Sequence, residues 1–276
     1  MEDLSDPDAA VQHELVARQL DEQIAGRFSV GQRLRVLDVG LGPGAPEPAT
    51  RGGSQALRLA RAGHRITVLE SDPRTLGMLR AALVTEPEGI RERVRFIEGA
   101  GRDTGVHFLP GSFDVVLCHG VLMYIAEPDA MLAGLARVLA PGGLLSLLVR
   151  NADALAMRPG IAGDWAGALS AFDSPVSTGL GGLKLRADRL GALTATLAGI
   201  GAPLHAWYGI RVFTGAAGDG ERPPHVFAGP VGDGERPPHA PPAAGLQARL
   251  AAEERAGRTD PYRAVAALLH LCGVRG

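Results

Sequence analysis

The chain has 276 residues, enough for one large α/β domain with small additions but too few for two full enzyme domains. Apolar residues make up 46% of the sequence and charged residues 21%, a balance that excludes a chain without a folded core. The formal net charge of −2 excludes a strongly basic nucleic-acid-binding protein recognised from charge alone, although it leaves room for a local basic patch.

The two cysteines, Cys118 and Cys272, are too few for a disulfide framework. They stand in apolar runs without metal-ligand spacing, so we expect small core residues. The acidic N-terminus has no apolar segment typical of a signal peptide, and no uncharged apolar run approaches the ~20 residues of a membrane span. We therefore expect a cytoplasmic protein that binds no metal, membrane or DNA.

The first predicted element is an amphipathic helix over residues 8–26, within an N-terminal helical lead-in of residues 1–30. The prediction rests on apolar side chains at helical spacing, which are Val11, Leu15, Val16, Leu20 and Ile24. We expect the remainder, residues 31–276, to form one domain.

Short apolar runs then alternate with helical patterns. We predict strands at Leu34–Val39, Ile66–Glu70, Val94–Ile97, Phe113–Cys118 and Leu144–Val149. We predict one helix at Gln55–Ala62 and a second that begins at Asp72-Pro73, with Asp72 as N-cap and Pro73 as first helical residue. A third predicted helix, Asp129–Leu139, is ended by Pro141-Gly142-Gly143. Continuous apolar strands joined by helices are typical of a parallel sheet covered on both faces, so the pattern predicts a doubly wound α/β fold.

The pattern changes after Arg150. Residues 152–204 favour helices and loops, and His205–Phe213 and Ala266–Val274 are two more predicted strands, which makes seven. Between those strands, residues 215–245 are rich in Pro and Gly and contain the octapeptide GDGERPPH twice. Because such a composition supports neither a helix nor a central strand, we predict a disordered insert in the domain.

The strongest chemical signal is the glycine-rich run Asp38–Gly44, which follows the first predicted strand. Glycines at this point let the backbone approach a ligand closely, but dinucleotide-binding enzymes have a similar loop. Asp38 discriminates between the two, because a carboxylate before the loop repels a pyrophosphate and attracts a cationic ligand. A nucleotide-dependent oxidoreductase is therefore disfavoured.

Polar residues also follow the next predicted strands. Glu70 ends the second strand, where a carboxylate can accept hydrogen bonds from ribose hydroxyls. An acidic side chain at Asp103, after the third strand, can bind an adenine amino group, and His119 ends the fourth strand. His119 taken alone is more simply a hydrogen-bonded histidine at the rim of the sheet. Together with Asp38, however, these residues fit an unphosphorylated, cationic nucleoside, S-adenosylmethionine.

With these motifs the sequence resembles the class I S-adenosylmethionine-dependent methyltransferases over about residues 34–149. The resemblance rests on Asp38–Gly44, Glu70, Phe113–Val116 and Leu139–Gly143. It implies a Rossmann-like methyltransferase fold, with a mostly parallel seven-stranded sheet and an N-terminal helix. Residues 31–276 are then the methyltransferase domain.

Segments outside the cofactor motifs resemble the tRNA 5-carboxymethoxyuridine methyltransferase family, which esterifies a modified uridine at the wobble position of the anticodon. They are His119–Leu122, Ala126–Pro128, Leu145–Leu147, Asn151–Ala152, Ile161–Gly163, Gly209–Phe213 and Asp260–Tyr262. The resemblance implies cofactor contacts at Gly40, Leu41, Glu70, Ser71, Gly101 and His119. The positions after the strands add Asp38, Gly42, Gly44, Arg102 and Asp103.

The chain also departs from that family. Gln12 is the best match to a family arginine that reaches the cofactor, and the glycine loop continues through Ala45–Arg51, so either Gly44 or Gly53 packs against the cofactor. The insert replaces a stretch that is helical in the family. These departures keep open a cofactor-binding module without catalysis.

A carboxylate acceptor has a pKa of roughly 4 and is ionised near neutral pH, so its methylation needs alignment rather than a general base. We accordingly name no catalytic residue. The acceptor needs a cation, for which Arg150 and Arg211 are the candidates. Tyr124 and Trp165 are candidates for stacking on a base, although core packing is an equal interpretation. The lack of net basic charge favours the alternative of a small carboxyl or hydroxyl substrate.

Overall fold

The computed structural model describes residues 7–40, 55–178, 184–214 and 242–276. Two predictions lie outside these residues. They are the glycine loop with Leu41, Gly42 and Gly44, and the insert up to residue 241 with both copies of the octapeptide.

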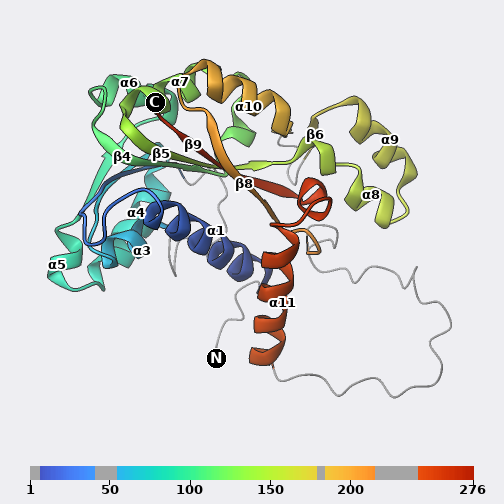
Figure 1. Cartoon of the computed structure of the whole chain (residues 1–276), viewed down its shortest axis with the longest axis horizontal. Helices are drawn as coiled ribbons and strands as arrows, with labels where there is room; N and C mark the ends of the chain where they lie inside the picture. The colour runs from blue at the N-terminus through green and yellow to red at the C-terminus, as the bar shows by residue number, and fades with distance from the viewer. Residues whose placement is uncertain (1–6, 41–54, 179–183, 215–241) are drawn as a thin grey trace.

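Seven strands form one sheet in the order β3-β2-β1-β4-β5-β9-β8 (Figure 1). They are β1 (Arg35–Val39), β2 (Arg65–Glu70), β3 (Val94–Glu98), β4 (Phe113–His119), β5 (Leu139–Arg150), β8 (Leu204–Ile210) and β9 (Leu268–Val274). Neighbouring strands from β3 to β5 are parallel, whereas β9 is antiparallel to both β5 and β8. The predicted fold, a mostly parallel seven-stranded sheet with an N-terminal helix, is confirmed.

The central strands are apolar throughout because both of their faces are buried. Leu37 of β1 and Val116 of β4 belong to the core on one face, while the adjacent Val36 and Val115 belong to the core on the other. Successive side chains of a strand point to opposite faces, so two covered faces demand the continuous apolar runs seen in the sequence.

Helices cover both faces of the sheet (Figure 1). On one face pack α7 (Asp129–Val138) and α10 (Leu190–Gly199), through buried side chains that include Leu132 and Leu197. On the other pack α1 (Pro7–Ala25), α3 (Gln55–Arg61) and α4 (Pro73–Val84). As predicted, Asp72 caps α4, its carboxylate accepting a hydrogen bond from the backbone N–H of Arg74.

Shorter elements complete the fold. They are α5 (Glu88–Arg91), α6 (Thr104–His107) and 3-10 turns at Gly101–Asp103, Leu122–Tyr124, Ala152–Ala154 and Tyr262–Val265. Beyond β5, α8 (Met157–Ile161), α9 (Trp165–Asp173) and a two-stranded sheet of β6 (Val176–Thr178) and β7 (Lys184–Arg186) lie to one side of the main sheet (Figure 1).

Three features differ from the sequence predictions. β5 begins at Leu139, paired with Phe113, so Pro141-Gly142-Gly143 lies within the strand rather than after the helix; Gly142 has a φ of 72°, which permits an irregular start. The sheet of β6 and β7 was not predicted, because three-residue strands show no periodicity. Helix α11 (Pro242–Ala256) begins inside the range predicted for the insert.

No helix in the described ranges is both long and apolar enough to cross a membrane.

Candidate functional site

The carboxyl ends of the parallel strands meet at one edge of the sheet, and the predicted residues lie along it. In the strand register Asp38 faces Val68, two residues before Glu70, and also faces Leu117, two residues before His119. The structure therefore brings together the ends of β1, β2 and β4, the edge where ligands bind in open α/β sheets.

Asp38 is a buried carboxylate, 5% exposed, at the end of β1. Burial, and after it the nearby Glu70, raise its pKa to about 7 against the opposing effect of a hydrogen bond from the backbone N–H of Ala56. Gly40 follows with a φ of 67°, and its N–H donates to the carbonyl of Leu69 at 2.8 Å. Gly40 thus ends the extended strand directly after Asp38, and a bound cation would stabilise the ionised form of the Asp38 carboxylate.

Glu70 is buried, 4% exposed, at the end of β2. Its Oε1 accepts hydrogen bonds from the backbone N–H groups of Ser71 at 2.7 Å and Asp72 at 2.9 Å, which fixes the carboxylate at the start of α4. A ribose diol would therefore meet Oε2 or compete with these amides at Oε1. Ser71 itself is exposed beside this carboxylate.

The turn after β3 holds the other predicted cofactor contacts. A Cβ atom at Gly101 would lie 2.6 Å from Cε of Met131 and 2.8 Å from Cγ1 of Val39, so a larger residue would have to displace these side chains between helix α7 and the end of β1. Asp103 is partly buried in the same turn, whereas Arg102 is exposed. The backbone at Gly101 is thereby held close to Val39, at the end of β1.

His119 ends β4 with a half-buried side chain. Its Nε2 lies 2.8 Å from Oγ of Ser146, and burial, together with the nearby His13, lowers its pKa to about 4. His13 comes from α1, whose backbone carbonyl at this residue accepts a hydrogen bond from Gln55 of α3. Sequence reasoning missed both His13 and Ser146, although Gln12, next to His13, marked the same turn of α1.

Arg150 ends β5 with a partly buried guanidinium. Its Nη1 donates to Oγ of Ser177 at 2.9 Å and to the carbonyl of Leu185 at 3.1 Å. Burial lowers its pKa, and Tyr124 lies near enough to oppose that shift. Within the described part of the chain no carboxylate pairs with Arg150, so the structure presents a desolvated cation beside a tyrosine.

Arg211 follows the end of β8. In the register Arg150 faces Leu268, which faces Ile210, so both arginines lie at the same edge of the sheet. Arg211 has a φ of 61°, the one positive φ of a non-glycine residue in the described ranges. Such a backbone conformation costs of order 1 kcal/mol and is common at functional sites.

Trp165 and Tyr124 have different surroundings. Trp165 is 69% exposed on α9, so core packing does not account for it, whereas Tyr124 is partly buried in its 3-10 turn. In the residues that the structure describes, no cluster of three or more His, Cys, Asp or Glu side chains is arranged to hold a metal ion.

Residues 37–147 match the family model described as a methyltransferase domain. The fold matches an S-adenosylmethionine-dependent methyltransferase from Mesorhizobium loti with a TM-score of 0.61, at 16% identity over 98% of this chain and all of that one. The chain therefore carries a methyltransferase domain over residues 37–147 and has the fold of an S-adenosylmethionine-dependent methyltransferase. The buried carboxylate of Asp38, with its raised pKa, and the closely packed turn at Gly101 fit the cation S-adenosylmethionine, the cofactor that the sequence predicts.

Two curated relatives cover part of the domain. The tRNA 5-carboxymethoxyuridine methyltransferase of Escherichia coli K12 is 34% identical over 134 residues, 49% of this chain and 47% of the relative. A ubiquinone biosynthesis O-methyltransferase of Xanthomonas euvesicatoria is 30% identical over 129 residues, 47% of this chain and 48% of the relative. The matches thus span about half the length of these relatives.

Proposed function

We propose that this protein transfers the methyl group of S-adenosylmethionine to the carboxylate of 5-carboxymethoxyuridine in tRNA. The similarity to the Escherichia coli enzyme of that name supports the choice of acceptor. Further support comes from the segments in which the sequence resembles that family outside the cofactor motifs, such as Gly209–Phe213 at the end of β8.

The observation that carries this proposal is Arg150, the partly buried guanidinium described above. Its Nη1 is held by Ser177 and Leu185, while Nε and Nη2 make no hydrogen bond with any described residue. A desolvated cation without an acidic partner gains free energy from a carboxylate ligand, which can accept two parallel N–H bonds from a guanidinium. Arg211 at the same edge would then meet a second anionic group, such as an RNA phosphate.

In this proposal Asp38, Glu70 and Gly101 hold the cofactor, which supplies the methyl group. Arg150 holds the acceptor carboxylate in line, and Tyr124 borders the acceptor. The carboxylate is ionised at neutral pH, so no residue has to remove a proton, and catalysis comes from proximity and orientation. His119 is neutral near pH 7, because its pKa is lowered to about 4, and this agrees with a site that needs no strong base.

The test is transfer of labelled methyl from S-adenosylmethionine to tRNA isolated from cells that lack the methyl ester. We expect label on tRNA that mild alkali releases, because an ester hydrolyses readily. Label that resists alkali would mean methylation at nitrogen, carbon or a hydroxyl and would contradict the carboxylate assignment. Absence of label on tRNA would exclude RNA as the acceptor.

A second candidate is a small-molecule carboxyl or hydroxyl acceptor, which the similarity to the ubiquinone biosynthesis O-methyltransferase favours. The exposed apolar side chains of α9, Trp165, Leu169 and Phe172, would suit a hydrophobic acceptor better than RNA. A phenol, with a pKa near 10, would need a base, and the lowered pKa of His119 makes that residue a weak one. Label transfer to small phenols and carboxylic acids, but not to tRNA, would favour this candidate.

A further inference from the structure

Four polar side chains form a continuous chain through the interior from His119 to helix α1; we call it the histidine relay. Nε2 of His119 lies 2.8 Å from Oγ of Ser146, which lies 2.8 Å from Nε2 of His270. Nδ1 of His270 lies 2.7 Å from Oε1 of Gln19. Ser146 and His270 are both 0% exposed, and Gln19 is buried. The relay therefore joins the rim of the cofactor site to a helix on the face of the sheet.

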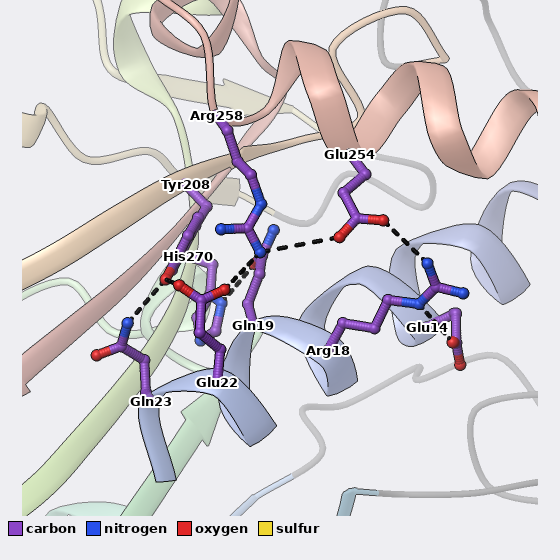
Figure 2. Close-up of polar contacts among 9 residues, drawn as sticks. All are labelled: Glu14, Arg18, Gln19, Glu22, Gln23, Tyr208, Glu254, Arg258 and His270. Atoms are coloured by element: carbon purple, nitrogen blue, oxygen red, sulfur yellow. Dashed lines mark hydrogen bonds and ion pairs between the residues drawn. The ribbon is translucent and has the colours of Figure 1, made fainter. Parts of the chain in front are cut away.

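The strand register places the relay between the sheet and α1. His119, Leu148, His270 and Tyr208 face one another across β4, β5, β9 and β8, and Ser146 is two residues before Leu148 on the same side. Leu148 packs in a core cluster with side chains of α1, which are Val11, Leu15 and Val16. Figure 2 shows Gln19 on α1 beside His270, with Tyr208 near it.

Both histidines of the relay are neutral. Burial lowers the pKa of His270 well below its ordinary value, the neighbouring His119 lowers it further, and the pKa of His119 is itself lowered to about 4. A neutral imidazole has one N–H donor and one acceptor nitrogen, so the hydrogen bonds of the relay must all run in one direction.

The orientation of the Gln19 amide sets the direction: its oxygen faces Nδ1 of His270 and can only accept, while its Nε2 has no hydrogen-bond partner among the described residues. Nδ1 of His270 must then carry the hydrogen, which leaves Nε2 as an acceptor for the hydroxyl of Ser146. The oxygen of Ser146 in turn accepts from Nε2–H of His119. The thiol of Cys272, whose pKa is raised to about 12 by burial, lies 3.7 Å from Nε2 of His270 and is a second donor toward that nitrogen.

The other neighbours of His270 do not reverse this direction. Tyr208 contacts it ring to ring, with centroids 5.8 Å apart. The hydroxyl of Tyr208 accepts from Gln23 at 2.8 Å and donates to Glu22, which pairs with Arg258 (Figure 2). The hydroxyl of Tyr208 thus has its hydrogen-bond partners in Gln23 and Glu22 and does not compete for a nitrogen of His270.

We propose that Gln19, Ser146 and His270 are positioning residues that keep His119 in the tautomer with hydrogen on Nε2, so that Nδ1 is an acceptor for S-adenosylmethionine. No described residue bonds to Nδ1 of His119. The cofactor presents donors that such a nitrogen can bind, including its ammonium and amino groups. This inference rests on the proposed cofactor site and adds a residue of α1 to the set that shapes it.

The direct test is the tautomer of His119 in the full-length protein, measured from ¹⁵N signals of the imidazoles in histidine-labelled protein without cofactor. We expect the Nε2–H form in the wild type. Ser146→Ala, which removes the bridging hydroxyl, and Gln19→Met, which removes the distant acceptor, should both yield a mixture with the Nδ1–H form. Tyr208→Phe is the control, because it keeps the ring contact with His270 and removes a hydroxyl that bonds to Gln23 and Glu22, outside the relay.

Cofactor titrations of the same variants provide the second measurement. Because about one hydrogen bond is lost, we expect the Kd for S-adenosylmethionine to rise about three- to tenfold in Ser146→Ala and Gln19→Met. In Tyr208→Phe the Kd should stay unchanged. An Nδ1–H tautomer in the wild type, or an unchanged tautomer in both relay variants, would overturn the proposal. If the wild type binds no S-adenosylmethionine, the proposed function fails. The tautomer measurement still tests whether Gln19, Ser146 and His270 control the tautomer of His119. Gln19→Met, far from the cofactor edge, decides the matter if Ser146→Ala does not fold.

Discussion

The charged groups at the ligand edge of one half of the sheet and those beside α1 and α11 in the other half are held in different ways. At the ends of β1 and β2, Asp38 and Glu70 have backbone amides as hydrogen-bond donors, and burial raises the pKa of Asp38 to about 7. Around β9, β8 and the helices α1 and α11, charged side chains pair with each other, as Arg258 does with Glu22 (Figure 2).

The pairing in the second half joins both ends of the chain. Arg18 of α1 bonds to Glu254 of α11 at 2.9 Å, and the buried Glu253 accepts hydrogen bonds from three successive backbone N–H groups at 212–214. Arg150, at the end of β5, has no acidic partner among the described residues. At the edge where ligands bind, Asp38 and Arg150 have no oppositely charged side-chain partner among the described residues, so a charged ligand can relieve the cost of burying them.

The largest effect on methyl transfer is expected from a substitution of Arg150. Arg150→Met keeps the length of the side chain but removes the cation, and one or two charge-assisted hydrogen bonds at about 1.5–3 kcal/mol each are lost. We expect kcat/KM for the acceptor to fall about 10- to 100-fold, measured by methyl transfer. Arg189→Ala, at an arginine 58% exposed and paired with Asp153, is the matched control and should change little.

The cofactor half is tested by Glu70→Gln, which retains an oxygen for the backbone amides of Ser71 and Asp72 but removes the charge. We expect the Kd for S-adenosylmethionine to rise about tenfold, measured by calorimetric titration. Glu98 faces Glu70 on β3 and is exposed, so Glu98→Gln is the matched control. An unchanged Kd in Glu70→Gln would remove Glu70 from the ribose contact.

Asp38→Asn should stabilise the protein without cofactor while weakening cofactor binding. The folded-state pKa of about 7 lies above the ordinary 3.8, so the folded protein holds this proton more tightly, and the contribution of Asp38 to stability falls as pH rises from about 4 to about 7. Above that range we expect the variant to be more stable by about 1–3 kcal/mol, after the cost of burying an amide. Denaturant unfolding at pH 5 and pH 8 checks this, since the difference between the two proteins should grow with pH.

The smallest effect is expected at the ion pairs of the second half. Arg18→Ala breaks its bonds to Glu14 and Glu254, but both partners are solvent-accessible, so we expect less than about 1 kcal/mol of destabilisation and no change in cofactor affinity. A loss of several kcal/mol in thermal unfolding would show that these pairs do more than tie α1 to α11.

Much of the first half could be predicted from the sequence, because its signals are local. The apolar run of β1 ends at Asp38, Glu70 ends the next strand, and Asp72-Pro73 starts a helix, all within a few residues of one another in sequence. The family resemblance extended the prediction to a mostly parallel sheet of seven strands with an N-terminal helix.

The rest depends on contacts between distant segments. Ser146 and His270 are single polar residues within apolar strands, and only the register of β5 and β9 brings them together, 124 residues apart in sequence. Gln19 lies on the buried side of α1, where its partner is 251 residues away. Helix α11 follows a Pro- and Gly-rich stretch, and its residues show no clear apolar face to predict it.

Calorimetric titration of S-adenosylmethionine into the wild type and Arg150→Met tests the division between the two halves most directly. We predict that both proteins bind one cofactor with the same Kd, because Arg150 belongs to the acceptor side of the edge. A wild type that does not bind, or an Arg150→Met variant weakened as much as Glu70→Gln, would contradict the account.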